Sequence, residues 1–249
     1  MSNNYQGSYG NYNPNWQKNS DTYTVDMVFC IDATGSMEDL TGKQQKLINV
    51  VKQNALNFYD DFKRKMEELK MPLAQLRVRV IAFRDYIADG PNAMKGTDFF
   101  ILPQQTKEFE ECINGIHADG GGDIPEDGLE ALAYAMKSKW TTEGTKKRQV
   151  IVVWTDAGTH ELGYGKSSPY YPKGMPANLS ELEEWWENMD YSAKRLVLFT
   201  PDANYWNYVN DNFEWTWHME TTANAGMADC GYDTILNLVV KSVAGKAQQ

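Results

Sequence analysis

The chain has 249 residues, long enough for one large domain or two small ones. Its 34 acidic and 24 basic side chains give a formal net charge of −10, which argues against a general binder of nucleic-acid phosphates or of anionic membranes. Hydrophobic residues make up 42% of the chain, enough for a substantial core, and we expect a single domain.

The sequence predicts a cytoplasmic protein. It contains no run of about 18 apolar residues, and its first residues lack the basic and then apolar pattern of a secretory signal. The three cysteines, Cys30, Cys112 and Cys230, form an odd and widely spaced set, which does not indicate a disulfide framework. The three histidines have no zinc-ligand spacing, so structural zinc is not expected.

The first elements follow a polar tail. Residues 1 to 20 are rich in Asn, Tyr, Gly, Ser and Gln, and we expect them to be disordered, with the domain spanning residues 21 to 249. The nearly continuous apolar run from Val25 to Ile31 predicts a strand buried on both faces, ending at Asp32. Apolar residues three and four apart from Leu47 to Leu69 predict one helix, ended by Pro72.

Strands and helices continue to alternate along the rest of the chain. The predicted strands are Leu76–Phe83, a short edge strand Asp98–Leu102, Val150–Trp154, Leu196–Phe199 and a weaker strand near Trp215. The predicted helices are marked by Phe109 and Ile113, by Leu129 and Met136, by Leu182 and Trp186, and by Ile235 and Val239. Ser180 and Glu183 have the spacing of a capping box.

This alternation predicts an α/β domain of the Rossmann-like, doubly wound kind, with a mostly parallel central sheet and helices on both faces. In such sheets ligands bind where the carboxyl ends of the strands meet the loops. The residues that follow each predicted strand are therefore the candidates for a functional site.

Three of these loops carry oxygen ligands. Asp32, Thr34 and Ser36 place a carboxylate and two hydroxyls at alternate positions after the first strand, while Asp123 follows a run of glycines and Asp156 follows the most apolar strand. Taken alone, each group is typical of a helix cap. Together at one sheet edge they favour a hard divalent cation, and the predicted metal is Mg²⁺ or Mn²⁺.

The Asp32-x-Thr34-x-Ser36 motif resembles the DxSxS signature of von Willebrand factor A (vWA) domains, whose metal-ion-dependent adhesion site (MIDAS) combines this loop with two others. The resemblance extends over essentially residues 21 to 249 and implies the vWA fold. It also implies that Thr34 and Ser36 bind the metal directly, whereas Asp32 and Asp156 act largely through water. The function it implies is a non-catalytic, metal-dependent module that binds a protein partner.

The second loop departs from the usual family pattern. Residues 120–126, Gly-Gly-Gly-Asp-Ile-Pro-Glu, contain no threonine and resemble the GGGDxPE variant of alpha-kinase-linked and hemicentin-like members. A carboxylate in place of a neutral hydroxyl adds negative charge and lowers the attraction of the metal for an acidic group of a partner. Asp123 is predicted as the second-loop ligand because it directly follows the glycines, and Glu126 and Asp127 are the alternatives.

Two other functions are compatible with the same oxygens. One is a divalent-metal-dependent phosphoester hydrolase, and the other is a vWA scaffold whose metal site is vestigial. A haloacid-dehalogenase-like phosphatase would need a second aspartate two residues after Asp32, where this chain has Thr34. No Ser-His-Asp or Cys-His set follows from the sequence, so we expect no catalytic activity.

Overall fold

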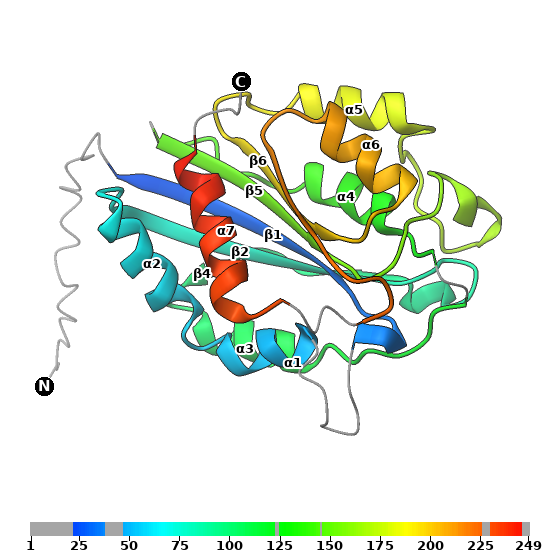
Figure 1. Cartoon of the computed structure of the whole chain (residues 1–249), viewed down its shortest axis with the longest axis horizontal. Helices are drawn as coiled ribbons and strands as arrows, with labels where there is room; N and C mark the ends of the chain where they lie inside the picture. Colours follow the sequence, from blue (N-terminus) through cyan, green and yellow to red (C-terminus); the bar gives the residue numbers. More distant parts are fainter. Residues whose placement is uncertain (1–21, 38–46, 123–124, 145, 226–229, 246–249) are drawn as a thin grey trace, which may run out of the picture.

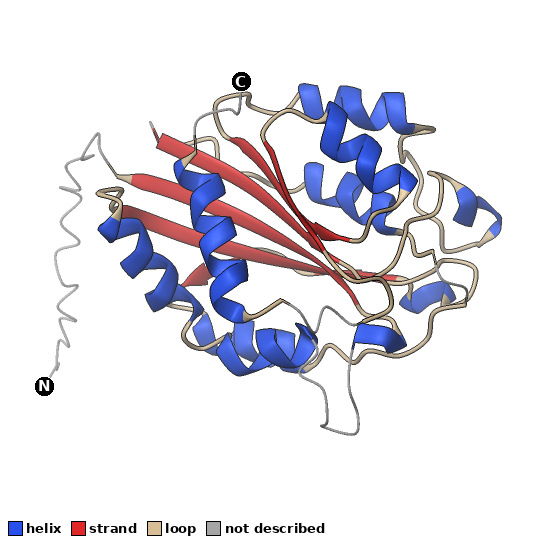
Figure 2. Cartoon of the chain, viewed as in Figure 1, coloured by secondary structure: helices blue, strands red, loops and turns tan. Residues whose placement is uncertain are grey.

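The computed structural model describes residues 22–37, 47–122, 125–144, 146–225 and 230–245. These residues form a mixed α/β fold in which a mostly parallel sheet lies between two layers of helices (Figures 1 and 2). The tail expected to be disordered, residues 1 to 20, and the site residue Asp123 lie outside the described residues. Within the described ranges, no helix combines the length and the apolar character needed to cross a bilayer.

The sheet has the strand order β3-β2-β1-β5-β6-β7, with β4 also paired to β2. Five strands run parallel to one another: β1 (Tyr23–Asp32), β2 (Leu73–Phe83), β5 (Lys146–Trp154), β6 (Lys194–Thr200) and β7 (Thr216–Glu220). The other two are antiparallel to β2: β3 (Met94–Gly96) and β4 (Phe100–Leu102). The carboxyl ends of the parallel strands consequently meet at one edge of the sheet, as predicted.

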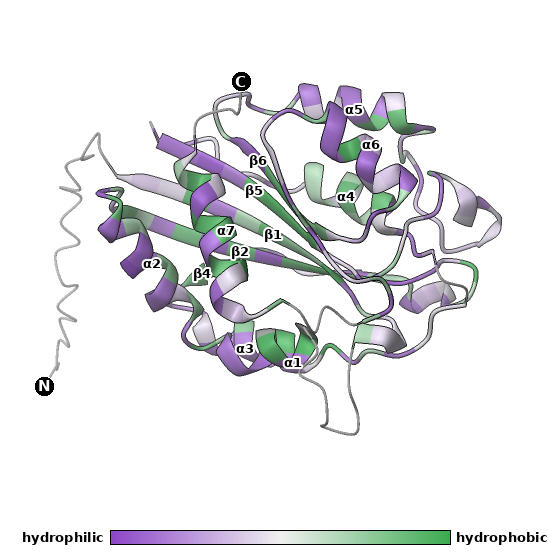
Figure 3. Cartoon of the chain, in the orientation of Figure 1, coloured by the Kyte–Doolittle hydropathy of each residue, from purple (hydrophilic) through white to green (hydrophobic). Residues whose placement is uncertain are grey.

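Both faces of the sheet are buried, because alternate side chains of the central strands point to opposite faces. On β1, Phe29 and Ile31 contact the core on one face, whereas Val28 and Cys30 contact the core on the other. Figure 3 shows this hydrophobic centre of the sheet. The first face is covered by α1 (Leu47–Asn54), α2 (Phe58–Glu68), α3 (Thr106–Asn114) and α7 (Tyr232–Ala244). The second face is covered by α4 (Gly128–Met136), α5 (Leu179–Glu187) and α6 (Asn204–Asn212).

The single helix predicted from Leu47 to Leu69 is wrong, because the structure has α1 and α2 with a turn between them. Asn54 donates from its side chain to the carbonyl of Val50 at 2.8 Å, and the N–H of Asn57 bonds the carbonyl of Asn54 at 3.1 Å. Asparagine competes for backbone hydrogen bonds in this way and favours turns over helix interiors. The apolar spacing continues across the turn, which is why it did not indicate the break.

The predictions for two other helices also need correction. The capping box at Ser180 and Glu183 is wrong: the N-cap of α5 is Asn178, whose side chain accepts from the N–H of Glu181 at 3.0 Å. The carboxylate of Glu181 in turn accepts from the N–H of Ala177 at 2.7 Å. Helix α6 was not predicted, because its buried residues are only Trp206 and Val209, too few to form an apolar stripe.

Two arginines bind the carboxyl end of α7. Arg195 donates to the carbonyls of Ser242 at 3.1 Å and Gly245 at 3.4 Å, and Arg148 donates to the carbonyl of Val243 at 2.8 Å. The last carbonyls of a helix carry partial negative charge, which favours cations. Burial, together with the neighbouring Arg148, lowers the pKa of Arg195 to about 10, so the guanidinium stays charged at neutral pH.

The N-cap of α5 gives a first prediction. We expect Asn178→Ala to lower the free energy of unfolding by about 1 kcal/mol, because it removes the acceptor for the Glu181 N–H. Urea unfolding measures this change. Ser180→Ala is the matched control, and it should change the free energy by less than about 0.5 kcal/mol. A larger effect at Ser180 than at Asn178 would contradict this N-cap.

Candidate functional site

The predicted site begins with the carboxylate of Asp32, which lies at the end of β1 and is fully buried. Its Oδ1 accepts from the N–H of Thr34 at 2.9 Å and from the hydroxyl of Thr34 at 2.6 Å. Its Oδ2 accepts from the hydroxyl of Thr155 at 2.6 Å. Burial raises the pKa of Asp32 to about 6, against the opposite effect of these hydrogen bonds.

Ser36 joins the first loop, which follows β1, to the third loop, which follows β5. Its hydroxyl donates to Oδ1 of Asp156 at 2.7 Å and lies 3.5 Å from the hydroxyl of Thr34. Asp156 follows β5 and is fully buried. The structure therefore brings together four of the five predicted site residues, namely Asp32, Thr34, Ser36 and Asp156.

This arrangement suits a small, hard cation. The hydroxyls of Thr34 and Ser36 each donate a hydrogen to a carboxylate, and a hydroxyl oxygen that donates its hydrogen in this way can still act as an acceptor toward an ion. Within the described residues, no three His, Cys, Asp or Glu side chains form a compact metal-binding cluster. The two hydroxyls lie between the carboxylates of Asp32 and Asp156, and Mg²⁺ keeps several of its waters, through which it can reach more distant carboxylates.

The second loop supplies a further carboxylate near the first loop. Gly121 has a positive φ of 86°, and a Cβ added there would lie 3.0 Å from Oε1 of Glu126 and 3.3 Å from Cβ of Thr34. Oε1 of Glu126 and the side chain of Thr34 thus both border the space beside Gly121. Asp127, the other alternative to Asp123, instead accepts from the N–H of Tyr86 at 2.6 Å through its Oδ2.

The environment of Glu126 is unfavourable for a negative charge. The residue is 3% exposed, and its Oε2 has no hydrogen-bond partner among the described residues. Burial raises the pKa of Glu126 to about 10, with further contributions from the charges of Asp32, Asp85 and Asp89. A carboxylate in such a place is stabilised either by a proton or by a cation.

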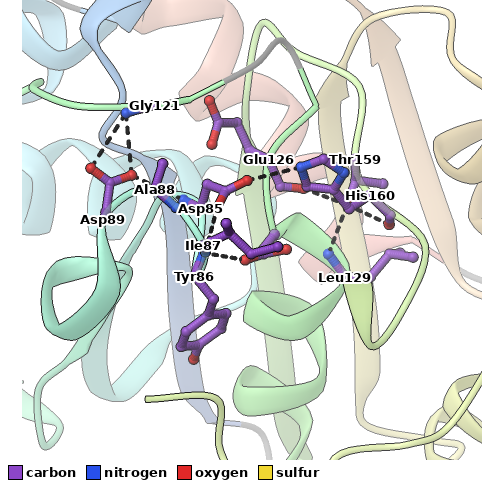
Figure 4. A network of polar contacts seen from close by, with 11 residues as sticks. Asp85, Tyr86, Ile87, Ala88, Asp89, Gly121, Glu126, Leu129, Thr159 and His160 are labelled. Carbon is purple, nitrogen blue, oxygen red and sulfur yellow. Dashed lines mark hydrogen bonds and ion pairs between the residues drawn. The ribbon is translucent and has the colours of Figure 1, made fainter. Parts of the chain in front are cut away.

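The loop after β2 lies beside the second loop and is shown in Figure 4. Asp85 accepts from the N–H of Ile87 at 2.5 Å and of Ala88 at 2.7 Å, and its Oδ2 lies 3.0 Å from Nε2 of His160. The ring of His160 stacks on Tyr164 with the ring centroids 3.8 Å apart. His160 thus contributes to the packing between the loop after β2 and the third loop, and its carboxylate partner is Asp85.

Arg84 fixes the backbone around the site, a role that sequence reasoning did not find. Its guanidinium is buried and donates to four carbonyls at 2.6 to 3.0 Å, those of Ala33, Asn92, His117 and Asp119. These carbonyls belong to three segments that are far apart in the chain. An arginine directly after a predicted strand is the only signal for this role in the sequence.

Glu130 on α4 holds the segment that follows His160. Its Oε1 accepts from the N–H of Gly163 at 2.9 Å and from the hydroxyl of Tyr171 at 2.8 Å. Burial raises the pKa of Glu130, and the two hydrogen bonds partly oppose the rise. Tyr171 also contacts Tyr86, with the ring centroids 5.2 Å apart, so this segment packs against the loop after β2.

Comparison with known proteins gives distant similarities. No family model matches the chain. The chain is 26% identical over 152 residues to alpha-protein kinase vwkA of Dictyostelium discoideum, a match that covers 61% of this chain and 21% of that protein. It is also 26% identical over 152 residues to integrin beta-PS of Drosophila melanogaster, covering 58% of this chain and 17% of that protein. The chain therefore corresponds to only a small part of each relative.

Among solved structures, the PilB minor pilin from Streptococcus sanguinis is similar with a TM-score of 0.54. The match covers 88% of this chain and 62% of that chain at 14% sequence identity. At this identity the similarity concerns the fold alone.

The contacts of Arg84 give a second prediction. We expect Arg84→Lys to lower the free energy of unfolding by about 3 kcal/mol, because one ammonium cannot serve four carbonyls in three segments. Chemical denaturation measures the change. Arg64→Lys, on an exposed face of α2, is the control and should stay within about 0.5 kcal/mol of the wild type. Equal effects at the two positions would contradict the role given to Arg84.

The raised pKa of Glu130 gives a third prediction. The stability that the protonated carboxyl provides is fully present below the ordinary value of 4.5 and is lost as the pH rises through the raised folded value. We therefore expect the wild type to lose more stability than Glu130→Gln between pH 4.5 and pH 8. Urea unfolding in EDTA at the two pH values measures this, with the exposed Glu184→Gln as control. Parallel losses in wild type and Glu130→Gln would contradict the prediction.

Proposed function

We propose that the chain is a vWA domain with a Rossmann-like fold that binds Mg²⁺ or Mn²⁺ and acts as a non-catalytic protein-interaction module. The observation that carries this proposal is the continuous series of contacts from Asp32 through Thr34 and Ser36 to Asp156, at the carboxyl edge of a mostly parallel sheet. The similarity to an integrin beta subunit and to alpha-protein kinase vwkA supports it.

The chemistry of the donors also supports a metal. Thr34 and Ser36 would hold the ion through their hydroxyls, while Asp32 and Asp156 orient these hydroxyls and supply negative charge. A bound dication would offset the repulsion between the carboxylates of the three loops. Asp123, which the sequence predicts as the second-loop ligand, lies outside the described residues, so its role stays a prediction.

Exposed apolar side chains next to the site support an interaction surface. Ile87 is 51% exposed, Tyr164 47% and Tyr170 54%, and all three are in the loops beside the candidate site. The ring of Tyr170 would lie 3.4 Å from a Cβ at Gly90, which places it against the loop after β2. Large aromatic side chains of this kind often anchor protein interfaces. The partner is a protein of unknown identity, and the cytoplasmic location stays a prediction.

Metal addition gives the fourth prediction. Mg²⁺ at about 100 times its dissociation constant should stabilise the wild type by about 2.7 kcal/mol, because the ion binds only the folded chain. We expect Asp156→Asn to lose most of this gain and the exposed Asp60→Asn to keep it. Differential scanning calorimetry with Mg²⁺ and with EDTA measures the effect. In a pull-down from extracts of the source organism, the wild type with Mg²⁺ should retain a protein partner. EDTA, or the substitution Asp156→Asn in the bait, should abolish this binding.

Two outcomes would contradict this proposal. Metal-dependent hydrolysis of p-nitrophenyl phosphate that disappears in Asp32→Ala would identify a phosphoester hydrolase instead. A melting temperature that neither Mg²⁺ nor Mn²⁺ changes would identify a scaffold with a vestigial site.

A further inference from the structure

The two edges of the central sheet differ in how they are protected against the addition of another strand. One edge is formed by β3 and β4, strands of three residues each that pair with β2. Lys95 is exposed on β3, and Pro103 directly follows β4. Short strands, lysine and proline are means by which natural sheets prevent edge-to-edge pairing. This edge is therefore unsuited to a further strand.

The opposite edge is β7, which lacks this protection. Its five residues, Thr216–Glu220, include neither lysine nor proline. Among the strands of the described residues, β7 pairs with β6 alone. Helix α6, labelled in Figure 1, contacts β7, and Asp211 is the only Asp, Glu, Lys or Arg among its nine residues. A neutral surroundings of this kind favours a protein contact, because charged residues are depleted at the centres of interfaces.

One side of the β7 backbone faces away from the sheet. The N–H of Leu196 in β6 donates to the carbonyl of Trp215 at 2.9 Å, and the N–H of Thr221 donates to the carbonyl of Thr200 at 3.0 Å. Backbone groups of successive residues in a strand point to opposite sides, so the odd-numbered residues face β6. Within the described part of the chain, the outward N–H and C=O groups have no backbone partner, and they belong to Thr216, His218 and Glu220.

We propose that β7 is an interface between two copies of this chain, which pair their β7 strands antiparallel about a two-fold axis. Such an axis uses the same surface on both copies and closes the assembly at a dimer. In the antiparallel arrangement, the outward residues of one strand exchange N–H···O bonds with the outward residues of the other. The two sheets then form one continuous sheet, whose remaining edges are the protected ones.

The sequence of β7 is complementary to itself in this arrangement. Full overlap of the two strands places His218 opposite His218 of the second copy, and Thr216 opposite Glu220 of the second copy. Glu220 is the only Asp, Glu, Lys or Arg of the strand, and it faces a neutral threonine instead of another carboxylate. Like charges directly opposite each other destabilise a strand pair, and this register has none. The match favours a second copy over an extended peptide of another protein.

The dimer also gives the candidate metal sites a defined arrangement, a consequence that rests on the proposed function. Antiparallel strands point their carboxyl ends in opposite directions, and the site lies at the carboxyl edge of the sheet. The two sites therefore face away from each other. One dimer can then bind two partner molecules on opposite sides.

The mass of the full chain in solution tests the interface and gives the fifth prediction. Sedimentation in EDTA should show a species of about twice 28.4 kDa at high protein concentration. His218→Lys and His218→Glu should each weaken the dimer at least about tenfold, because two like charges would face each other across the axis. An equimolar mixture of the two variants should recover the dimer, because lysine then faces glutamate. Lys95→Glu, on the opposite edge, is the matched control and should keep the wild-type mass.

The outcomes of these measurements support or overturn the interface without involving the metal. A wild type that stays monomeric would overturn it, as would a dimer that persists unchanged in both His218 variants. Two monomeric variants that do not associate when mixed would overturn the pairing of His218 with its own copy. EDTA is present throughout, so failure of the dimer leaves the metal site of the proposed function untouched.

Hydrogen exchange of the wild type covers the case in which a substitution at His218 unfolds β7. Peptides that cover β7 should exchange more slowly at high protein concentration than at low concentration, because their outward N–H groups become hydrogen-bonded. Peptides that cover β3 should exchange equally at both concentrations. Equal exchange of β7 at the two concentrations would overturn the inference whatever the variants show.

Discussion

The hydrogen bonds of the buried Asp32 carboxylate determine the geometry of the candidate site. A buried carboxylate is costly unless its oxygens are satisfied, and here they are satisfied by hydroxyls from two different loops, those of Thr34 and Thr155. The two loops can meet because β1 and β5 are parallel neighbours, paired up to Ile31 and Trp154. Once these hydrogen bonds form, Ser36 is within reach of Asp156, so the fold and the site depend on the same buried group.

Charge is unevenly distributed at this edge of the sheet. Carboxylates converge from the first, second and third loops, while the nearby Arg84 donates its hydrogen bonds to backbone carbonyls. Arg84 thus supports the loops that carry the acids, although within the described part of the chain its hydrogen bonds all go to backbone carbonyls. The remaining excess of negative charge is the reason that we propose a dication, and not a neutral ligand, for this site.

Much of the fold follows from local patterns in the sequence. The apolar runs that end at Asp32 and Trp154 predict buried parallel strands correctly, because burial on both faces leaves few polar positions. The position of Asp32, Thr34, Ser36 and Asp156 at one edge follows from the same reasoning. The break after Asn54 and the helix around Trp206 could not be predicted in this way. The first depends on a side-chain hydrogen bond of Asn54, and the second on single large residues. The orientation of Glu126 depends on the space at Gly121, which only the folded chain defines.

The two arginines that bind the carboxyl end of α7 indicate where the folded unit ends. Arg148 and Arg195 lie in β5 and β6, yet their acceptors include the carbonyls of Ser242, Val243 and Gly245. A shorter chain that ended within α7 would leave the buried guanidinium of Arg195 and the half-buried guanidinium of Arg148 with fewer acceptors. The last helical turn is therefore tied directly to the central strands, and we expect a stable folded unit to extend at least to Gly245.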